Sequence, residues 1–194
     1  YDMGRQIAFA PGWLENQSIW MHMSYKYYLQ LLRGKLYKEF FSEYKSGGIL
    51  PFMNATVYGR PLTECSSFIA SSAFPDPGIH GMGFVARRSG STAEFLDIYK
   101  LMFLGPKLFS LTEDRELVFQ LKPALPSWLF VDEAADGKAL QDDEGRYLVS
   151  FKLFGQIPVT YHTPDGGDLF GVSPNSYTIT MKDGSSEDVT DSVV

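Results

Sequence analysis

Hydrophobic residues in the first part of the chain recur near the helical period of about 3.6 residues. Apolar side chains spaced three or four positions apart predict a helix over residues 18–33, and Gly34 suits its end. Those positions are Ile19, Trp20, Met23, Tyr27 and Leu31. The same spacing predicts a second helix over residues 35–44, which Gly47 and Gly48 stop.

Proline and glycine divide the stretch that follows. After a loop over residues 50–59, Pro61 stands where it favours a first helical turn, which predicts a helix over residues 62–72. The density of proline and glycine over residues 74–83 predicts a long loop, a kind that is often functional. A further helix is predicted over residues 92–104, ending at Gly105 and Pro106.

Beyond this point the pattern changes to short runs of β-branched and aromatic residues. They lie at residues 117–121, 147–154, 158–162 and 177–181, separated by clusters of Gly, Asp and Pro. Such runs are typical of antiparallel strands, here in a small β-sandwich. The acidic end, residues 183–194, is expected to fray.

Charge follows the same division, which places a domain boundary near residue 110. Residues 1–110 hold eleven Lys and Arg against eight Asp and Glu, a net charge of +3; residues 111–194 hold six against fifteen, a net charge of −9. We therefore expect an α+β chain with a helical domain over residues 1–110 and a β-sandwich domain over residues 111–194. Aromatic residues surround much of each helix, so we expect the chain to be the C-terminal piece of a larger helical fold.

Composition excludes several classes of protein. With 44% hydrophobic residues among 194, the chain can bury a core, and it has no apolar run of membrane-spanning length. The net charge of −6 argues against nucleic-acid binding. Cys65 is the only cysteine and the three histidines lack metal-ligand spacing, so we expect no disulfide within the chain and no metal or cofactor.

The start of the predicted fourth helix is a candidate anion site. Ser91 and Glu94 have the spacing of a capping box, and a helix start presents free N–H groups and a positive dipole end. Arg87 and Arg88 precede it, and Gly90 lets the backbone approach a ligand. A phosphate-sized anion would fit there. The alternative is an ordinary capped helix with solvated arginines.

Three other residues allow both a functional and a structural interpretation. His22, placed mid-helix, could donate to an anion or could simply pack among aromatic residues. Glu64 could accept a hydrogen bond from a sugar hydroxyl beside a stacking surface formed by Tyr58 or Phe74. Alternatively, its carboxylate could simply be stabilised by the positive end of its predicted helix. Glu15 allows the same two interpretations.

Four segments of the chain follow one another in a fixed order. They read Glu15-Asn16-Gln17-Ser18 with His22, Glu64-Cys65-Ser66-Ser67-Phe68, Ser89-Gly90-Ser91-Thr92-Ala93, and Leu121-Lys122-Pro123-Ala124-Leu125-Pro126-Ser127-Trp128. In this order they resemble segments in the C-terminal portion of glycoside hydrolase family 94, the cellobiose and chitobiose phosphorylase type. The family's segments are Glu-Asn-Gly-Gly with a following His, Glu-Pro-Tyr-Val-Tyr, Thr-Gly-Thr-Ala-Ala and Ile-Asp-Pro-Cys-Ile-Pro-Ser-Asp-Trp. Gln17 and Ser18 replace the paired glycines, whereas Ser89 keeps the threonine's hydroxyl.

The resemblance implies a fold, an activity and residue roles. The fold would be the last helices of an (α/α)6 toroid followed by a jelly-roll-like β-domain. His22, Ser89 and Gly90 would hold inorganic phosphate as co-substrate, and Glu64 would lie in the sugar subsite. The activity would be inverting phosphorolysis of a β-glycosidic bond to a sugar 1-phosphate. The general-acid Asp of the family lies upstream, so we expect no catalytic residue in this chain and no activity from it alone.

Two alternatives stay open: a relative of the same fold that hydrolyses or merely binds saccharide, and a structural module that associates through its acidic β-domain. The expected partners are an oligosaccharide, phosphate and the preceding part of the same protein, with a homodimer as an option; nucleic acid and membrane are not expected. The expected location is cytoplasmic.

Overall fold

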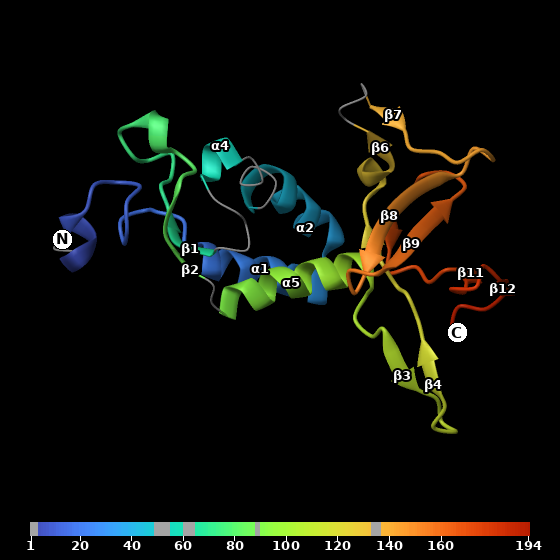
Figure 1. Ribbon diagram of the computed structural model, residues 1–194. Helices are drawn as coiled ribbons and strands as arrows, with labels where there is room; N and C mark the ends of the chain where they lie inside the picture. The colour runs from blue at the N-terminus through green and yellow to red at the C-terminus, as the bar shows by residue number, and fades with distance from the viewer. Residues whose placement is uncertain (1–3, 49–54, 60–64, 88–89, 133–136) are drawn as a thin grey trace. The chain divides into compact units, whose positions relative to one another are not determined.

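The computed structural model describes residues 4–48, 55–59, 65–87, 90–132 and 137–194 (Figure 1). It combines a few helices with short antiparallel strands, so the chain is α+β. The residues fall into two compact units, Tyr1–Lys100 and Leu101–Val194, which we describe separately. The division lies within helix α5 (Gly90–Phe103).

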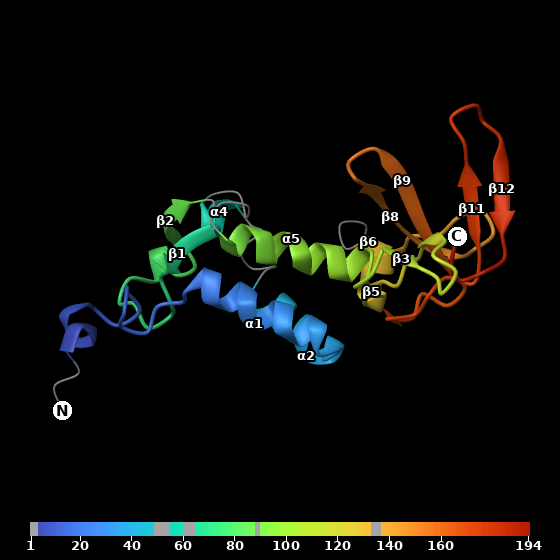
Figure 2. The ribbon, with the colours of Figure 1, turned by 90° about the horizontal axis from the view of Figure 1, so that it is seen from below.

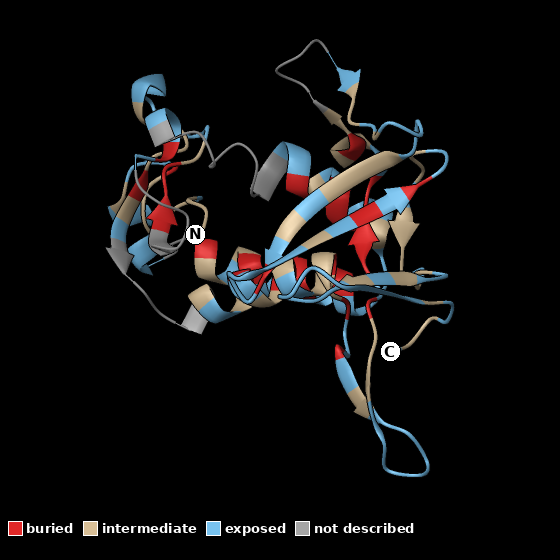
Figure 3. Ribbon diagram, turned by 45° about the vertical axis from the view of Figure 1, so that its right-hand side comes forward, coloured by how far each residue is buried: buried red, intermediate tan, exposed pale blue. Residues whose placement is uncertain are grey.

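Helices α1 (Met21–Arg33) and α2 (Tyr37–Glu43) carry most of the core of the first unit. The helix predicted over residues 18–33 is confirmed, and Gly34 follows its last residue. Its buried residues are Met21, Tyr25, Tyr28, Leu29, Leu31 and Leu32, of which only Leu31 is among the positions that gave the helical spacing (Figure 3). Met23 and Tyr27 are 57% and 53% exposed, so α1 has a second apolar stripe that this unit does not cover.

Short helical elements precede and follow α1 along the chain. The chain begins with a 3-10 turn, η1 (Gly4–Ala8), and a π-helical turn, η2 (Tyr44–Gly48), continues α2. Helix α4 (Ala55–Tyr58) packs on α1, because the buried Tyr58 hydroxyl donates to Sδ of Met21 at 3.2 Å. A second 3-10 turn, η3 (Pro77–Ile79), is capped by Asp76, whose carboxylate accepts from the Gly78 N–H.

The helix predicted over residues 62–72 is wrong, because residues 65–69 form a strand. Strand β1 (Cys65–Ile69) pairs antiparallel with β2 (Gly83–Arg87), with Phe68 opposite Phe84. On its other edge, Ile69 exchanges two backbone hydrogen bonds with Ile19 at 2.7 and 3.0 Å. Backbone pairing on both edges therefore overrides the helical signal of the local sequence.

Helices α1 and α5 lie side by side and run in the same direction (Figures 1 and 2). Near their starts, the rings of Tyr25 and Phe95 pack with centroids 5.2 Å apart. Farther along both helices, Arg33 donates to Asp97 at 2.7 Å. Helix α5 begins at Gly90, so Ser91 lies inside the helix and does not occupy the expected cap position.

The second unit is built from short strands. They are β3 (Phe109–Leu111), β4 (Leu117–Phe119), β5 (Ala124–Leu125), β6 (Val131–Asp132), β7 (Lys138–Ala139), β8 (Tyr147–Leu153), β9 (Ile157–Thr163), β10 (Leu169–Phe170), β11 (Tyr177–Thr180) and β12 (Ser186–Val189), with a 3-10 turn, η4 (Ser127–Phe130). The described strands pair two by two and antiparallel, and β5 pairs with the distant β10. The second unit therefore contains small antiparallel strands, and their arrangement as a sandwich stays a prediction.

Aromatic packing holds the longest hairpin, β8–β9, in the second unit. Phe151 stacks on Tyr161 with centroids 5.8 Å apart and contacts the Phe103 ring at 5.2 Å. The Tyr161 hydroxyl also donates to the Phe103 carbonyl at 2.6 Å. Burial raises the pKa of Tyr161, so this hydroxyl remains a donor at neutral pH.

Candidate functional site

His22 lies in the first turn of α1, at the end of that helix nearest to the start of α5 (Figure 2). Its ring meets the Trp20 ring edge to face at 5.7 Å, which orients the imidazole. Nδ1 of His22 is buried and has no hydrogen-bond partner among the described residues. An unsatisfied buried nitrogen costs about 1–3 kcal/mol, so it is a place where a ligand or a water molecule would add a missing bond.

The start of α5 brings a second set of groups to this end of the unit. Gly90 opens the helix, whereas Ser89 lies outside the described residues. Within the part of the chain that is described, Oε2 of Glu94 is buried and likewise accepts no hydrogen bond. The Tyr25–Phe95 contact holds the two helix starts next to each other. We call His22 and the start of α5, Gly90 to Ala93, the helix-start site, and we leave out the Glu94 carboxylate because it would repel an anion.

The backbone at both helix starts favours a negative ligand. The first N–H groups of an α-helix have no partner within the helix, and they lie at its positive dipole end. At α1 the N-cap residue is Trp20, whose side chain caps none of these groups. Two such helix starts, with the unpartnered His22 nitrogen in the first turn of one of them, provide donors for an oxyanion.

Glu15 lies in a tight loop just before α1, which we call the Trp13 loop (residues 12–17). Asn16 closes this loop, because its backbone bonds to Gly12 and Trp13 and its side-chain Nδ2 donates to the Phe9 carbonyl at 2.8 Å. The Glu15 carboxylate is solvent-accessible and pairs with Arg5 at 3.6 Å.

The backbone on either side of Glu15 is strained. Leu14 and Gln17 have φ values of 47° and 63°, the left-handed region that costs a non-glycine residue about 1–2 kcal/mol. Such strain persists only where the surrounding structure imposes it, and it is common at functional sites. The loop that carries Glu15 is thus held in a costly conformation.

The interpretation of Glu64 as a sugar-binding residue stays a prediction, and one of its two candidate stacking partners is excluded. Glu64 lies outside the described residues. Tyr58 is 1% exposed and cannot offer a ring to a ligand, so that part of the interpretation is wrong. Phe74 is half-buried and packs against Trp13 at 5.4 Å.

Trp13 is the residue that the sequence reasoning missed. Its ring lies 4.6 Å from Phe84, 5.0 Å from Phe68 and 5.4 Å from Phe74. These partners are more than fifty positions away in the chain, so no local pattern identifies the cluster. The one available signal was a tryptophan directly before the Glu15-Asn16 segment.

A charged cluster in the second unit has a structural role. Burial opposes ionisation of Asp142, but hydrogen bonds from the Arg146 side chain, the backbone and His162 outweigh it and lower the pKa of Asp142 to about 2. These bonds close the turn that leads into β8. Among the described residues, no group of three His, Cys, Asp or Glu could hold a metal ion.

Comparisons of the chain with protein-family models, with curated proteins and with solved structures found no match. Within the described residues, no helix is long and apolar enough to span a membrane.

Proposed function

We propose that the full-length protein is a glycoside phosphorylase of inverting type, and that this chain supplies its phosphate site. The observation that carries the proposal is the helix-start site. It brings His22 and Gly90, which the sequence separates by almost seventy positions, to the same end of two adjacent helices. Both residues belong to segments that resemble the family's phosphate-binding motifs.

In this proposal the residues of the helix-start site hold phosphate and do not exchange bonds with it. A ring N–H of His22 and the backbone N–H of Gly90 donate to phosphate oxygens, as does the Ser89 hydroxyl. Hydrogen bonds to a charged group contribute about 1.5–3 kcal/mol each, and together they would fix the orientation of the nucleophile. Holding phosphate in place removes much of the entropic barrier to its attack.

The reaction needs one protein acid. A phosphate oxygen forms a bond to the anomeric carbon while the glycosidic C–O bond breaks, and the leaving oxygen takes a proton from a carboxylic acid. The product is a sugar 1-phosphate of inverted configuration. An inverting hydrolase needs a second carboxylate as base for water, whereas phosphate is already an anionic nucleophile. The proton donor is assigned to an Asp in the preceding part of the protein.

The test is a turnover assay with the full-length protein and two substrates, cellobiose and N,N′-diacetylchitobiose. The proposal predicts release of a sugar 1-phosphate that stops when phosphate is omitted. Equal cleavage with and without phosphate would contradict phosphorolysis and favour a hydrolase of the same fold. Binding without any cleavage would favour a non-catalytic relative.

A further inference from the structure

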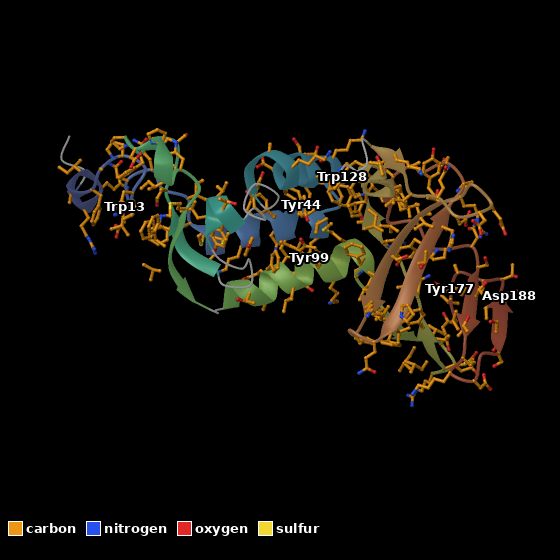
Figure 4. All side chains as sticks on the ribbon, turned by 45° about the horizontal axis from the view of Figure 1, so that its top comes forward. Trp13, Tyr44, Tyr99, Trp128, Tyr177 and Asp188 are labelled. Atoms are coloured by element: carbon orange, nitrogen blue, oxygen red, sulfur yellow. The ribbon has the colours of Figure 1, made fainter. Side chains whose placement is uncertain are left out.

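The hairpin of β3 and β4 carries an apolar face that the described part of the second unit leaves largely exposed. Phe109 lies opposite Phe119, and one step along the same face Leu111 lies opposite Leu117. Phe109, Leu111 and Leu117 are 50%, 64% and 69% exposed, whereas Phe119 packs against the ring of Tyr177 at 6.2 Å (Figure 4). The hairpin points away from β8 and β9 (Figures 1 and 3).

The two edges of this hairpin differ in their backbone hydrogen bonds. On the β4 edge, the Phe119 backbone exchanges two bonds with Val194, at 2.6 and 2.9 Å. Because the Phe119 groups point away from β3, the opposite residue, Phe109, directs its own N–H and C=O away from β4. Leu111, two positions along the strand, has the same orientation. Neither residue has a backbone partner on that side among the described residues, so the β3 edge offers two donors and two acceptors.

This edge is complementary to a second copy of itself. When two β3 strands run antiparallel with Ser110 opposite Ser110, Phe109 of each copy lies opposite Leu111 of the other. Each of these pairs exchanges two backbone hydrogen bonds, so the four bonds together satisfy every edge group of both copies. The two apolar faces join on one side of the sheet. A two-stranded hairpin, which is marginal by itself, thereby becomes half of a four-stranded sheet.

Charge favours the same register. Continuing the pairing by two residues brings Lys107 of each copy toward Glu113 of the other. Both side chains belong to exposed residues, and within the described residues neither forms an ion pair. The hairpin tip also carries Asp114 and Glu116, and antiparallel pairing keeps the two acidic tips at opposite ends of the sheet. A parallel arrangement would bring the tips together, where like charges repel.

We propose that two copies of this protein associate through the free edge of β3, with a two-fold axis at Ser110. The interface uses the same surface on both copies and gives a sheet in the order β4-β3-β3-β4, with a Lys107–Glu113 ion pair at each end. An edge of three residues buries less than the roughly 1,200–2,000 Å² of a standard stable interface. We therefore expect a reversible equilibrium between monomer and dimer, with a dissociation constant on the order of micromolar.

The test is sedimentation velocity of the full-length protein at concentrations from about 1 to 100 µM, on either side of the expected dissociation constant. Leu111→Pro removes a donor that each copy uses, and we expect dimerisation to weaken about 10-fold or more. The hairpin should tolerate this proline, because β4 does not use the Leu111 N–H. Leu117→Pro is the matched control: it changes the opposite leucine, on the other edge of the same hairpin, and should dimerise as the wild type does.

A charge exchange tests the register and leaves the backbone unaltered, so it decides the question even if a proline variant unfolds. Lys107→Glu should weaken dimerisation about 3- to 10-fold, because it sets two like charges against each other at both ends of the interface. Combining it with Glu113→Lys should restore the wild-type dissociation constant.

Three results would overturn the proposal: a full-length protein that stays monomeric at every concentration, a dimer that Leu111→Pro leaves unchanged, and equal loss of the dimer in Leu111→Pro and Leu117→Pro. A combined charge variant that dimerises no better than Lys107→Glu alone would contradict it as well.

Discussion

Replacing Gly12 with alanine tests how firmly the Trp13 loop is fixed. Two costs are expected. The φ of +81° is unfavourable for alanine by about 1–2 kcal/mol. The new Cβ would also lie 2.8 Å from Cα and Cβ of Phe74, where ordinary contacts begin at 3.4 Å. Forcing such an overlap costs about 1–3 kcal/mol more, because the backbone of one loop must shift.

Gly59→Ala is the matched control for this substitution. Gly59 has a φ of +80°, almost the same as that of Gly12, but an added Cβ meets no atom of the described residues within 4 Å. The control therefore carries the conformational cost alone, about 1–2 kcal/mol. The difference between the two variants isolates the contact with Phe74.

Urea denaturation of the full-length protein measures both effects as changes in the free energy of unfolding. We expect Gly12→Ala to be destabilised by about 1–3 kcal/mol more than Gly59→Ala. Equal destabilisation of the two variants would refute the claim that the Trp13 loop is fixed against Phe74.

Two further predictions concern packing and pH. Tyr44→Phe removes the 2.9 Å hydrogen bond between the Tyr44 and Tyr99 hydroxyls and should lower the free energy of unfolding by about 1 kcal/mol, as measured by denaturation; no change would refute a role for that bond. Because hydrogen bonds hold the folded pKa of Asp142 near 2, below its unfolded value, its contribution to stability is full above pH 4 and is lost as the pH falls toward 2. Asp142→Asn should flatten the acid side of the stability profile, and an NMR titration of this carboxyl with a midpoint near pH 4 would contradict the assignment.

Local pattern was sufficient for some elements and not for others. The helical spacing before Gly34 predicted α1, and the β-rich runs predicted β8, β9 and β11 within one or two residues. It failed at residues 65–69, where pairing with β2 and Ile19 decides the conformation. The spacing did not identify the buried face of α1, because that helix carries two apolar stripes and only packing selects between them.

The candidate site, too, could be predicted from the sequence only in part. His22 and Gly90 could be chosen from the sequence because each lies in a short motif, whereas their common location depends on how α1 and α5 pack. Trp13 could not be chosen, since its partners come from β1, β2 and the loop between them. The left-handed backbone around Glu15 is likewise imposed by tertiary contacts and has no signature in leucine or glutamine.

The helix-start site is tested most directly by titrating inorganic phosphate into the full-length protein in a calorimeter. For the double variant His22→Ala and Ser89→Ala, the account predicts at least about 10-fold weaker phosphate binding with an unchanged unfolding transition. His162→Ala, which removes an imidazole from the second unit, should bind phosphate as the wild type does. Equal phosphate affinity in the double variant and the wild type would contradict the account.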